Sequence, residues 1–139
     1  MKSNILKKEK ITSIHANLAT INVDKTLDYY KNIGFKVLQK FPETGESEWG
    51  WVEKDDIRLM FQNKTSLFKE FPELNFQTQG GALTLWFQVE NIAEWYENIK
   101  DKTKVIRPLG VTPYNGANEF VIIDINGFIL HFSDFQLKN

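Results

Sequence analysis

The sequence contains no cysteine, only two histidines and no long apolar run among its 139 residues. Without cysteine the chain has neither disulfides nor thiolate metal sites, so its fold must depend on an apolar core. No stretch approaches the ~20 consecutive apolar residues of a membrane span. The formal charge is -1, and the basic residues are spread along the chain. These features argue against a membrane protein and against a nucleic-acid-binding surface.

The first ten residues carry lysines but lack the apolar run of a secretory signal. We therefore expect a flexible N-terminal tail over residues 1–10 and a cytoplasmic protein. The remaining length is that of one ordinary domain, which can bury a core without covalent links. Aromatic residues make up 14% of the chain, including eleven phenylalanines and four tryptophans. Some of these belong to the core, and others are suited to a cleft for flat or apolar ligands.

The last part of the chain, residues 118–133, predicts two strands joined by a tight turn at Asn126-Gly127. Because successive side chains of a strand point to opposite faces, His131 is predicted to lie opposite an apolar face. That apolar face, which should pack on the core, comprises Phe128, Leu130 and Phe132. A simple core has no need of an imidazole in the middle of a strand, so the second face is a candidate functional surface.

An internal repeat organises the sequence. Hydrophobic periodicity predicts strands over 11–21, 35–41, 48–53 and 57–62, with a helix over 22–34; strands then follow over 82–89, 105–108 and in the final hairpin, with a helix over 91–100. Each half therefore has the order strand, helix, three strands. We predict an α+β fold in which two βαβββ modules form a partly open barrel around a concave cleft. The predicted domain covers 11–139, with module 1 at about 11–62, a linker at 63–80 and module 2 at about 81–135.

Two separated motifs resemble the vicinal oxygen chelate superfamily, which includes glyoxalase I, bleomycin-resistance proteins and extradiol dioxygenases. The run from His15 to Phe35 is similar to the family's opening, and the run from Asp124 to His131 is similar to its closing hairpin. The loop Val111–Gly116 and the strand after it resemble bleomycin-resistance-like members. The resemblance extends over residues 11–135 and implies the family's fold, a cleft and a homodimer.

In metal-dependent members of this family, four strands each supply one metal ligand. His15 and His131 match the first and last of these positions, whereas Arg58 or Met60 and then Thr84 occupy the other two. Arginine and threonine are not usual metal ligands, and methionine is a soft one. The sequence therefore predicts no complete metal site and no certain cofactor; a divalent metal at the two histidines would need donors from a substrate or partner subunit. The alternative is that each histidine is a hydrogen-bonded strand residue.

Strand alternation selects the other candidate site residues. Together with the family resemblance, it predicts that the following residues face a ligand: Trp49, Trp51, Arg58, Met60, Thr84, Trp86, Gln88 and Tyr114. For acid–base chemistry the candidates are His15, His131 and Glu119. Each also has a structural interpretation. The tryptophans could close a barrel or contact a second subunit, and the charged residues could form surface ion pairs.

The sequence is compatible with three functions. The first is a small-molecule-binding protein of the glyoxalase/bleomycin-resistance type, which sequesters an aromatic or cationic-aromatic ligand, as in antibiotic resistance. The second is a metal-dependent enzyme, such as a glyoxalase, lyase or dioxygenase, that uses His15 and His131. The third is a non-catalytic interaction protein. The sequence leaves open whether the protein is an enzyme, because one fold hosts many functions.

Overall fold

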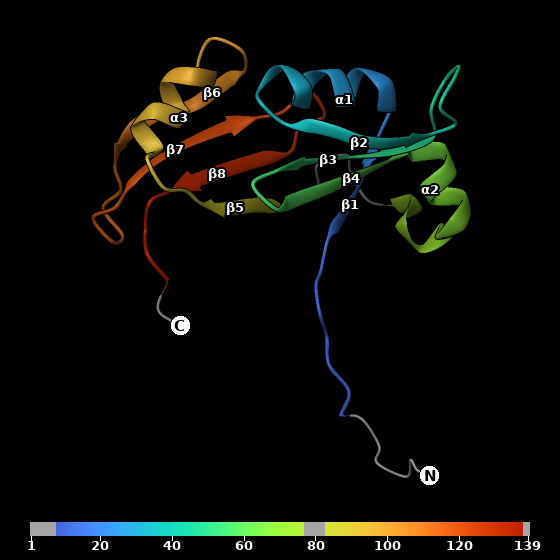
Figure 1. Ribbon diagram of the computed structural model, residues 1–139, viewed down its shortest axis with the longest axis horizontal. Coiled ribbons are helices and arrows are strands. Elements are labelled where there is room, and N and C mark those ends of the chain that lie inside the picture. The colour runs from blue at the N-terminus through green and yellow to red at the C-terminus, as the bar shows by residue number, and fades with distance from the viewer. Residues whose placement is uncertain (1–7, 77–82, 138–139) are drawn as a thin grey trace.

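The computed structural model describes residues 8–76 and 83–137, and it shows the predicted order of elements in each half (Figure 1). Module 1 contains β1 (Ala16–Thr20), α1 (Val23–Asn32), β2 (Lys36–Phe41), β3 (Trp49–Lys54) and β4 (Ile57–Asn63). Module 2 contains β5 (Thr84–Gln88), α3 (Ile92–Ile99), β6 (Lys104–Val111), β7 (Asn118–Ile123) and β8 (Ile129–Ser133). Between the modules lie α2 (Lys64–Glu70) and the 3-10 helix η1 (Pro72–Phe76).

Each module forms its own four-stranded sheet. The order is β1-β4-β3-β2 in the first sheet, sheet A, and β5-β8-β7-β6 in the second, sheet B. In both sheets the first strand of the module runs parallel to the last strand, and the remaining pairs are antiparallel. The same topology therefore occurs twice, which confirms the predicted α+β fold of two βαβββ modules.

The first helix begins and ends where its sequence dictates. The Asn22 side chain accepts a hydrogen bond from the backbone N–H of Lys25 at 2.9 Å, which satisfies one of the free donors of the first turn. The buried stripe of α1 includes Val23 and Leu27, which recur at helical spacing. Gly34 ends the helix with a φ of 110°, a backbone conformation that other residues rarely adopt.

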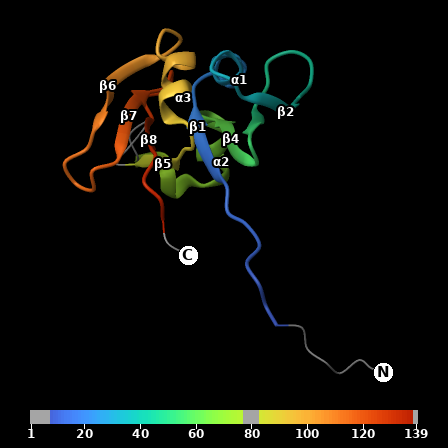
Figure 2. The same cartoon turned by 60° about the vertical axis from the view of Figure 1, so that its left-hand side comes forward.

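The two long helices lie on the same side of the molecule. In Figure 1, α1 and α3 lie along the upper side, above β7, β8 and the strands of sheet A, while residues 8–15 extend away on the opposite side. Figure 2 shows the same N-terminal segment extending away from the two sheets. One buried cluster connects both modules and includes Leu27, Tyr30, Phe61, Phe120, Leu130 and Phe132. The predicted core face of the last strand is therefore confirmed. None of the helices in the described ranges is long and apolar enough to cross a membrane.

The loop between β7 and β8 joins module 2 to module 1. The Tyr30 hydroxyl donates to Asp124 at 2.5 Å, and the Asn126 side chain contacts Thr20 and Thr26 at 2.7 and 3.0 Å. Burial raises the pKa of the Asp124 carboxyl above its ordinary value, although hydrogen bonds from Tyr30 and the loop backbone oppose this shift. Burial beside this carboxyl also raises the pKa of Tyr30. A polar contact between the modules is thus enclosed by their common core.

The same loop corrects one expectation. The predicted two-residue turn at Asn126-Gly127 is wrong, because the last paired residues are Ile123 and Ile129 and the loop between them covers 124–128. The loop is closed by its own carboxylate: Asp124 accepts hydrogen bonds from the backbone N–H groups of Asn126 and Phe128 at 2.8 and 2.9 Å. Such a side-chain-to-backbone motif stabilises a longer loop than the sequence pattern indicated.

Some boundaries also differ from the predicted ones. β1 begins at Ala16 rather than at residue 11, and the preceding residues 8–15 are extended without strand pairing. β6 continues to Val111, past Pro108, with register shifts that accommodate the proline. The segment between the modules contains the seven-residue helix α2, which Asn63 caps. The parts of the predicted tail, linker and fifth strand that fall on residues 1–7 and 77–82 lie outside the described residues.

Candidate functional site

The face of each sheet turned away from α1 and α3 is here called its open face. Cross-strand register defines which side chains share it. On sheet A one row contains Asn17, Met60, Trp51 and Gln39, and the next contains Ala19, Gln62, Trp49 and Phe41. On sheet B one row contains Trp86, His131, Val121 and Arg107, and the next contains Gln88, Ser133 and Glu119.

The rarest chemically versatile residues of the chain gather on these open faces. The sequence has two histidines, two arginines and four tryptophans. Both histidines, both arginines and three of the tryptophans lie on the open faces, and only Trp95 lies elsewhere, on α3. Nothing in the packing of the core requires this segregation, because the core is built from other aromatic and aliphatic residues. The two surfaces are therefore the candidate functional site.

On sheet A the aromatic cluster centres on Trp51. The Trp49 ring lies 5.7 Å from the Trp51 ring, and His15 meets Trp51 edge-on at 6.3 Å. The Arg58 guanidinium lies over the same ring at 5.1 Å, while its Nε donates to Glu53 at 2.7 Å. The guanidinium thus satisfies both a carboxylate and a ring face. The indole N–H of Trp51 is buried and has no hydrogen-bond partner among the described residues.

On sheet B a carboxylate joins two basic side chains. Glu119, only 13% exposed, lies 3.3 Å from Nε2 of His131 and 3.6 Å from Nη1 of Arg107. Trp86 lies on the edge strand β5, directly opposite His131, and is 41% exposed. The structure therefore brings together His131 and Glu119, which the sequence offered as separate candidates, and adds Arg107.

The other predicted residues are distributed around these two clusters. Thr84 and Gln88 share the exposed face of β5 with Trp86, as strand alternation predicted, and Gln88 also contacts Gln136 at 3.2 Å. Met60 lies beside Trp51 in the same row of sheet A. Tyr114 is at the tip of the β6–β7 loop and 90% exposed. Hydrogen bonds between Thr112 and the loop backbone hold this tip in place.

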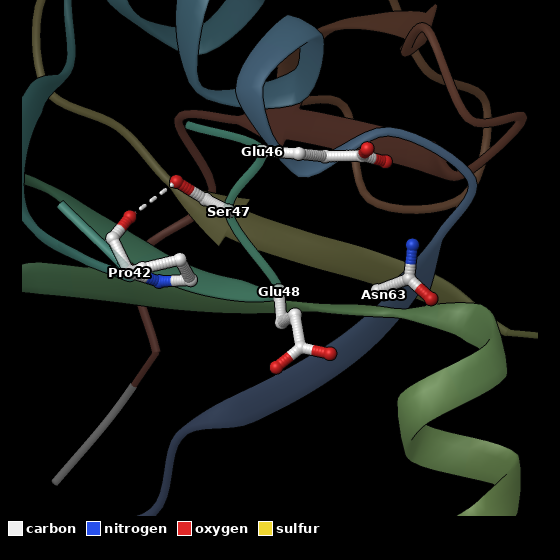
Figure 3. A pocket seen from close by; sticks show the side chains of 5 residues that line it. All are labelled: Pro42, Glu46, Ser47, Glu48 and Asn63. Atoms are coloured by element: carbon white, nitrogen blue, oxygen red, sulfur yellow. Dashed lines mark hydrogen bonds between the residues drawn. The ribbon is translucent and has the colours of Figure 1, made fainter. Parts of the chain in front are cut away.

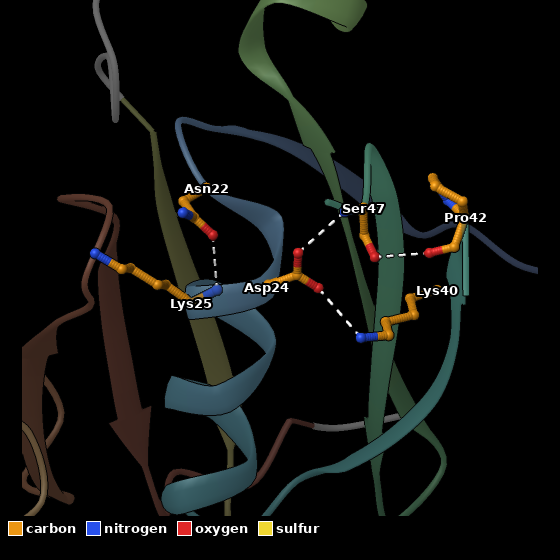
Figure 4. A network of polar contacts seen from close by, with 6 residues as sticks. All are labelled: Asn22, Asp24, Lys25, Lys40, Pro42 and Ser47. Carbon is orange, nitrogen blue, oxygen red and sulfur yellow. Dashed lines mark hydrogen bonds and ion pairs between the residues drawn. The ribbon is translucent and has the colours of Figure 1, made fainter. Parts of the chain in front are cut away.

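Two hollows lie away from the open faces. The first, of about 310 Å³, is at the β2–β3 end of sheet A and is lined by Pro42, Glu46, Ser47, Glu48 and Asn63 (Figure 3). Its wall is fixed by Asp24, which accepts hydrogen bonds from the Ser47 backbone and from Lys40 (Figure 4). The second, of about 360 Å³, lies beside Trp95 between the ends of α1 and α3. The residues that line these two hollows include none of the predicted site residues.

A metal centre does not fit this arrangement. Across the described residues, no three histidine, aspartate or glutamate side chains come together in a way that could hold a metal ion. At the second predicted ligand position Arg58 is committed to Glu53 and Met60 is a soft donor, and at the third Thr84 is an exposed residue of an edge strand. His131 and Glu119 provide two adjacent donors, fewer than the three protein ligands of a usual catalytic zinc site.

Sequence reasoning did not identify Glu53 and Arg107 as residues of the open faces. Arg107 precedes Pro108, where the predicted strand ended, so its place in a continued, irregular β6 was not visible. The rarity of arginine could have indicated Arg107 as a functional candidate, because the chain has only one other arginine. Glu53 could have been found by pairing the predicted third and fourth strands, since it lies opposite Arg58.

Comparison with known protein families matches residues 12–132 to the Glyoxalase/Bleomycin resistance protein/Dioxygenase superfamily. The match spans both modules and confirms the resemblance seen in the two motifs. This chain therefore belongs to that superfamily. A comparison with curated proteins found no match.

Solved structures share the fold at low sequence identity. TioX from Micromonospora sp. ML1 is 17% identical and has a TM-score of 0.68, over 88% of this chain and 97% of its own. A bleomycin resistance determinant encoded on the transposon Tn5 is 15% identical, with a TM-score of 0.67 over 91% and 100%. The bleomycin-binding protein from Streptomyces verticillus, complexed with copper(II)-bleomycin, is 16% identical, with a TM-score of 0.64 over 93% and 100%.

Proposed function

We propose that this protein binds and sequesters an aromatic or cationic-aromatic small molecule on its open faces, without chemical conversion. The observation that supports the proposal is the segregation of both histidines, both arginines and three tryptophans onto those faces. Tryptophan provides a large, flat contact area, and the nearby polar groups can fix the orientation of a ligand. Two fold neighbours are a bleomycin-binding protein and a bleomycin resistance determinant, which agrees with a binding role.

Covering the exposed aromatic surface with a ligand would also be energetically favourable. Leaving Trp86 41% exposed forgoes part of the burial that stabilises such a side chain by about 1.5–3 kcal/mol. A ligand ring stacked on it would recover that burial and add roughly 0.5–1.5 kcal/mol from ring geometry. In the open-face cluster of sheet B the acidic and basic groups are close to balance, so an aromatic ligand meets no large net charge.

The resemblance also implies a homodimer, and we propose one here. Residues 8–15 extend from the body, and Ile11 and Ile14 are both 92% exposed within this chain. Two isoleucines at such exposure are available to pack against a second copy. Sedimentation of the full chain should give the mass of a dimer at micromolar concentration; a monomer at that concentration would contradict this part of the proposal. The expected cytoplasmic location remains a prediction.

Binding is tested by quenching of tryptophan fluorescence with bleomycin and with a panel of planar aromatic compounds. We expect saturable quenching that Trp86→Leu weakens by at least several-fold. The control is Ile57→Ala, which removes apolar surface at a residue 50% exposed that neighbours Arg58 on β4 and therefore points to the face opposite the open one. A wild-type protein that responds to no compound of the panel would refute the proposal and favour an interaction role. Stoichiometric Zn, Ni, Fe or Mn in protein purified without chelator would favour the metal-dependent alternative.

A further inference from the structure

The two open faces use their arginines differently. Arg58 on sheet A is 40% exposed, donates to Glu53 at 2.7 Å and lies over the Trp51 ring. Arg107 on sheet B is 66% exposed, and its nearest carboxylate oxygen, on Glu119, is 3.6 Å from Nη1, beyond a hydrogen bond. The guanidinium of Arg58 is therefore already occupied, whereas that of Arg107 has donors to offer.

The tryptophans differ in the same way. Trp51 is covered by Arg58, His15 and Trp49. Trp86 is 41% exposed, and the ring–ring and cation–ring contacts of the described residues involve the other three tryptophans but not Trp86. Sheet B thus presents both an uncovered indole and an available guanidinium, while on sheet A the equivalent groups contact each other.

Cross-strand register fixes the relation between these two groups. Trp86, His131, Val121 and Arg107 form one row across the four strands of sheet B. Three strand spacings of about 4.8 Å place the Trp86 and Arg107 backbones roughly 14 Å apart. A ligand that contacts both must be longer than a single ring. Glu119 forms an ion pair with Arg107 at 3.6 Å from Nη1 but makes no hydrogen bond to it, so the N–H groups of the guanidinium can still bind a ligand.

We propose that sheet B selects an elongated aromatic acid, with its ring system on Trp86 and its acidic group on Arg107. A guanidinium binds a carboxylate through two parallel hydrogen bonds, which gives direction as well as attraction. The inference rests on the proposed binding function and narrows it, because it specifies the charge at one end of the ligand. Arg107 is then the specificity-determining residue.

The test uses three compounds of the same shape: para-biphenylcarboxylate, its neutral carboxamide and the cationic para-biphenylmethylammonium. Isothermal titration of the full chain should show that the carboxylate binds about tenfold more tightly than the carboxamide, as expected for a charge-assisted hydrogen bond. Arg107→Gln should reduce the affinity for the carboxylate to that for the carboxamide, and leave the carboxamide unchanged. Arg107→Lys should retain part of the preference.

The charge-matched control is Lys25→Gln, on the exposed side of α1, which should change neither affinity. Thermal unfolding of each variant confirms that it is folded. Equal binding of carboxylate and carboxamide, tighter binding of the cation, or an acid preference that survives Arg107→Gln would overturn the inference and leave the proposed function intact. If none of the three compounds binds the wild-type protein, the inference is refuted as well, whereas the proposed function is refuted only if the protein also responds to no compound of the fluorescence panel.

Discussion

Replacing Tyr30 with phenylalanine tests how the two modules are held together. The Tyr30 hydroxyl donates to the buried Asp124 carboxylate at 2.5 Å, across 94 positions of sequence. Phenylalanine keeps the ring contacts with Phe35 and Phe61, at 5.4 and 4.9 Å, so the change removes little besides the hydroxyl. A hydrogen bond to a charged group contributes about 1.5–3 kcal/mol, and we expect the free energy of unfolding to fall by about 2 kcal/mol at neutral pH.

The pH dependence gives this prediction a second readout. Burial raises the pKa of Asp124 above the ordinary value of 3.8, and the Tyr30 hydrogen bond opposes that shift. A raised carboxyl pKa gives stability that is fully present below the ordinary value and is lost as pH rises through the folded-state pKa. Without the Tyr30 hydroxyl the pKa of Asp124 rises further, so the folded state loses more stability when Asp124 ionises. The deficit of Tyr30→Phe should therefore be smaller near about pH 4 than near about pH 7.

Urea unfolding followed by circular dichroism measures both quantities, with the slope of the transition as a check on two-state behaviour. A deficit below about 0.5 kcal/mol at neutral pH would refute the reasoning, because a surface substitution has effects of that size. A deficit that grows toward acid pH would refute the assignment of the charge to Asp124.

Two further predictions concern module 1. A Cβ at Gly50 would lie 2.8 Å from Leu27, so Gly50→Ala should lower the free energy of unfolding by about 1–3 kcal/mol, measured in urea; an unchanged midpoint would show that α1 can move away. A hydrogen bond from the Ser47 backbone is the main cause that lowers the pKa of Asp24 below 3.8. The ionised Asp24 carboxylate therefore stabilises the folded state above that pH, and this stabilisation is lost as pH falls through the folded-state pKa. Asp24→Asn should cost about 1 kcal/mol at neutral pH and progressively less in acid; a difference that is independent of pH would contradict this.

Periodicity and alternation predicted the repeated modules and most of the open-face residues. Trp49 and Trp51 share a face, as do Thr84, Trp86 and Gln88, because the two-residue period of a strand is a local property. The buried faces of α1 and of β8 followed from the same reasoning. These features could be predicted because each depends only on residues a few positions apart.

The remaining features depend on contacts between distant segments. The loop after β7 is closed by Asp124 and bound by Tyr30 and Thr20, and no local pattern indicates that pairing. The association of Glu119 with His131 and Arg107 requires the register of three strands, and the irregular β6 hides it from sequence. Arg58 donates a hydrogen bond to Glu53 and lies over Trp51, whereas Arg107 forms only an ion pair with Glu119. This difference depends on side-chain conformations, which no local sequence pattern predicts.

The central claim, that ligands bind on the open faces, is tested most directly by the four indole N–H signals of the protein in a two-dimensional nitrogen–proton NMR spectrum. Trp49, Trp51 and Trp86 lie on those faces, whereas Trp95 lies on α3 and serves as an internal control. On titration with an aromatic ligand, the Trp86 signal should shift most and the Trp95 signal should not shift. The Trp49 and Trp51 signals should shift only if the ligand also contacts sheet A. A shift of Trp95 alone, with Trp86 unchanged, would contradict the account.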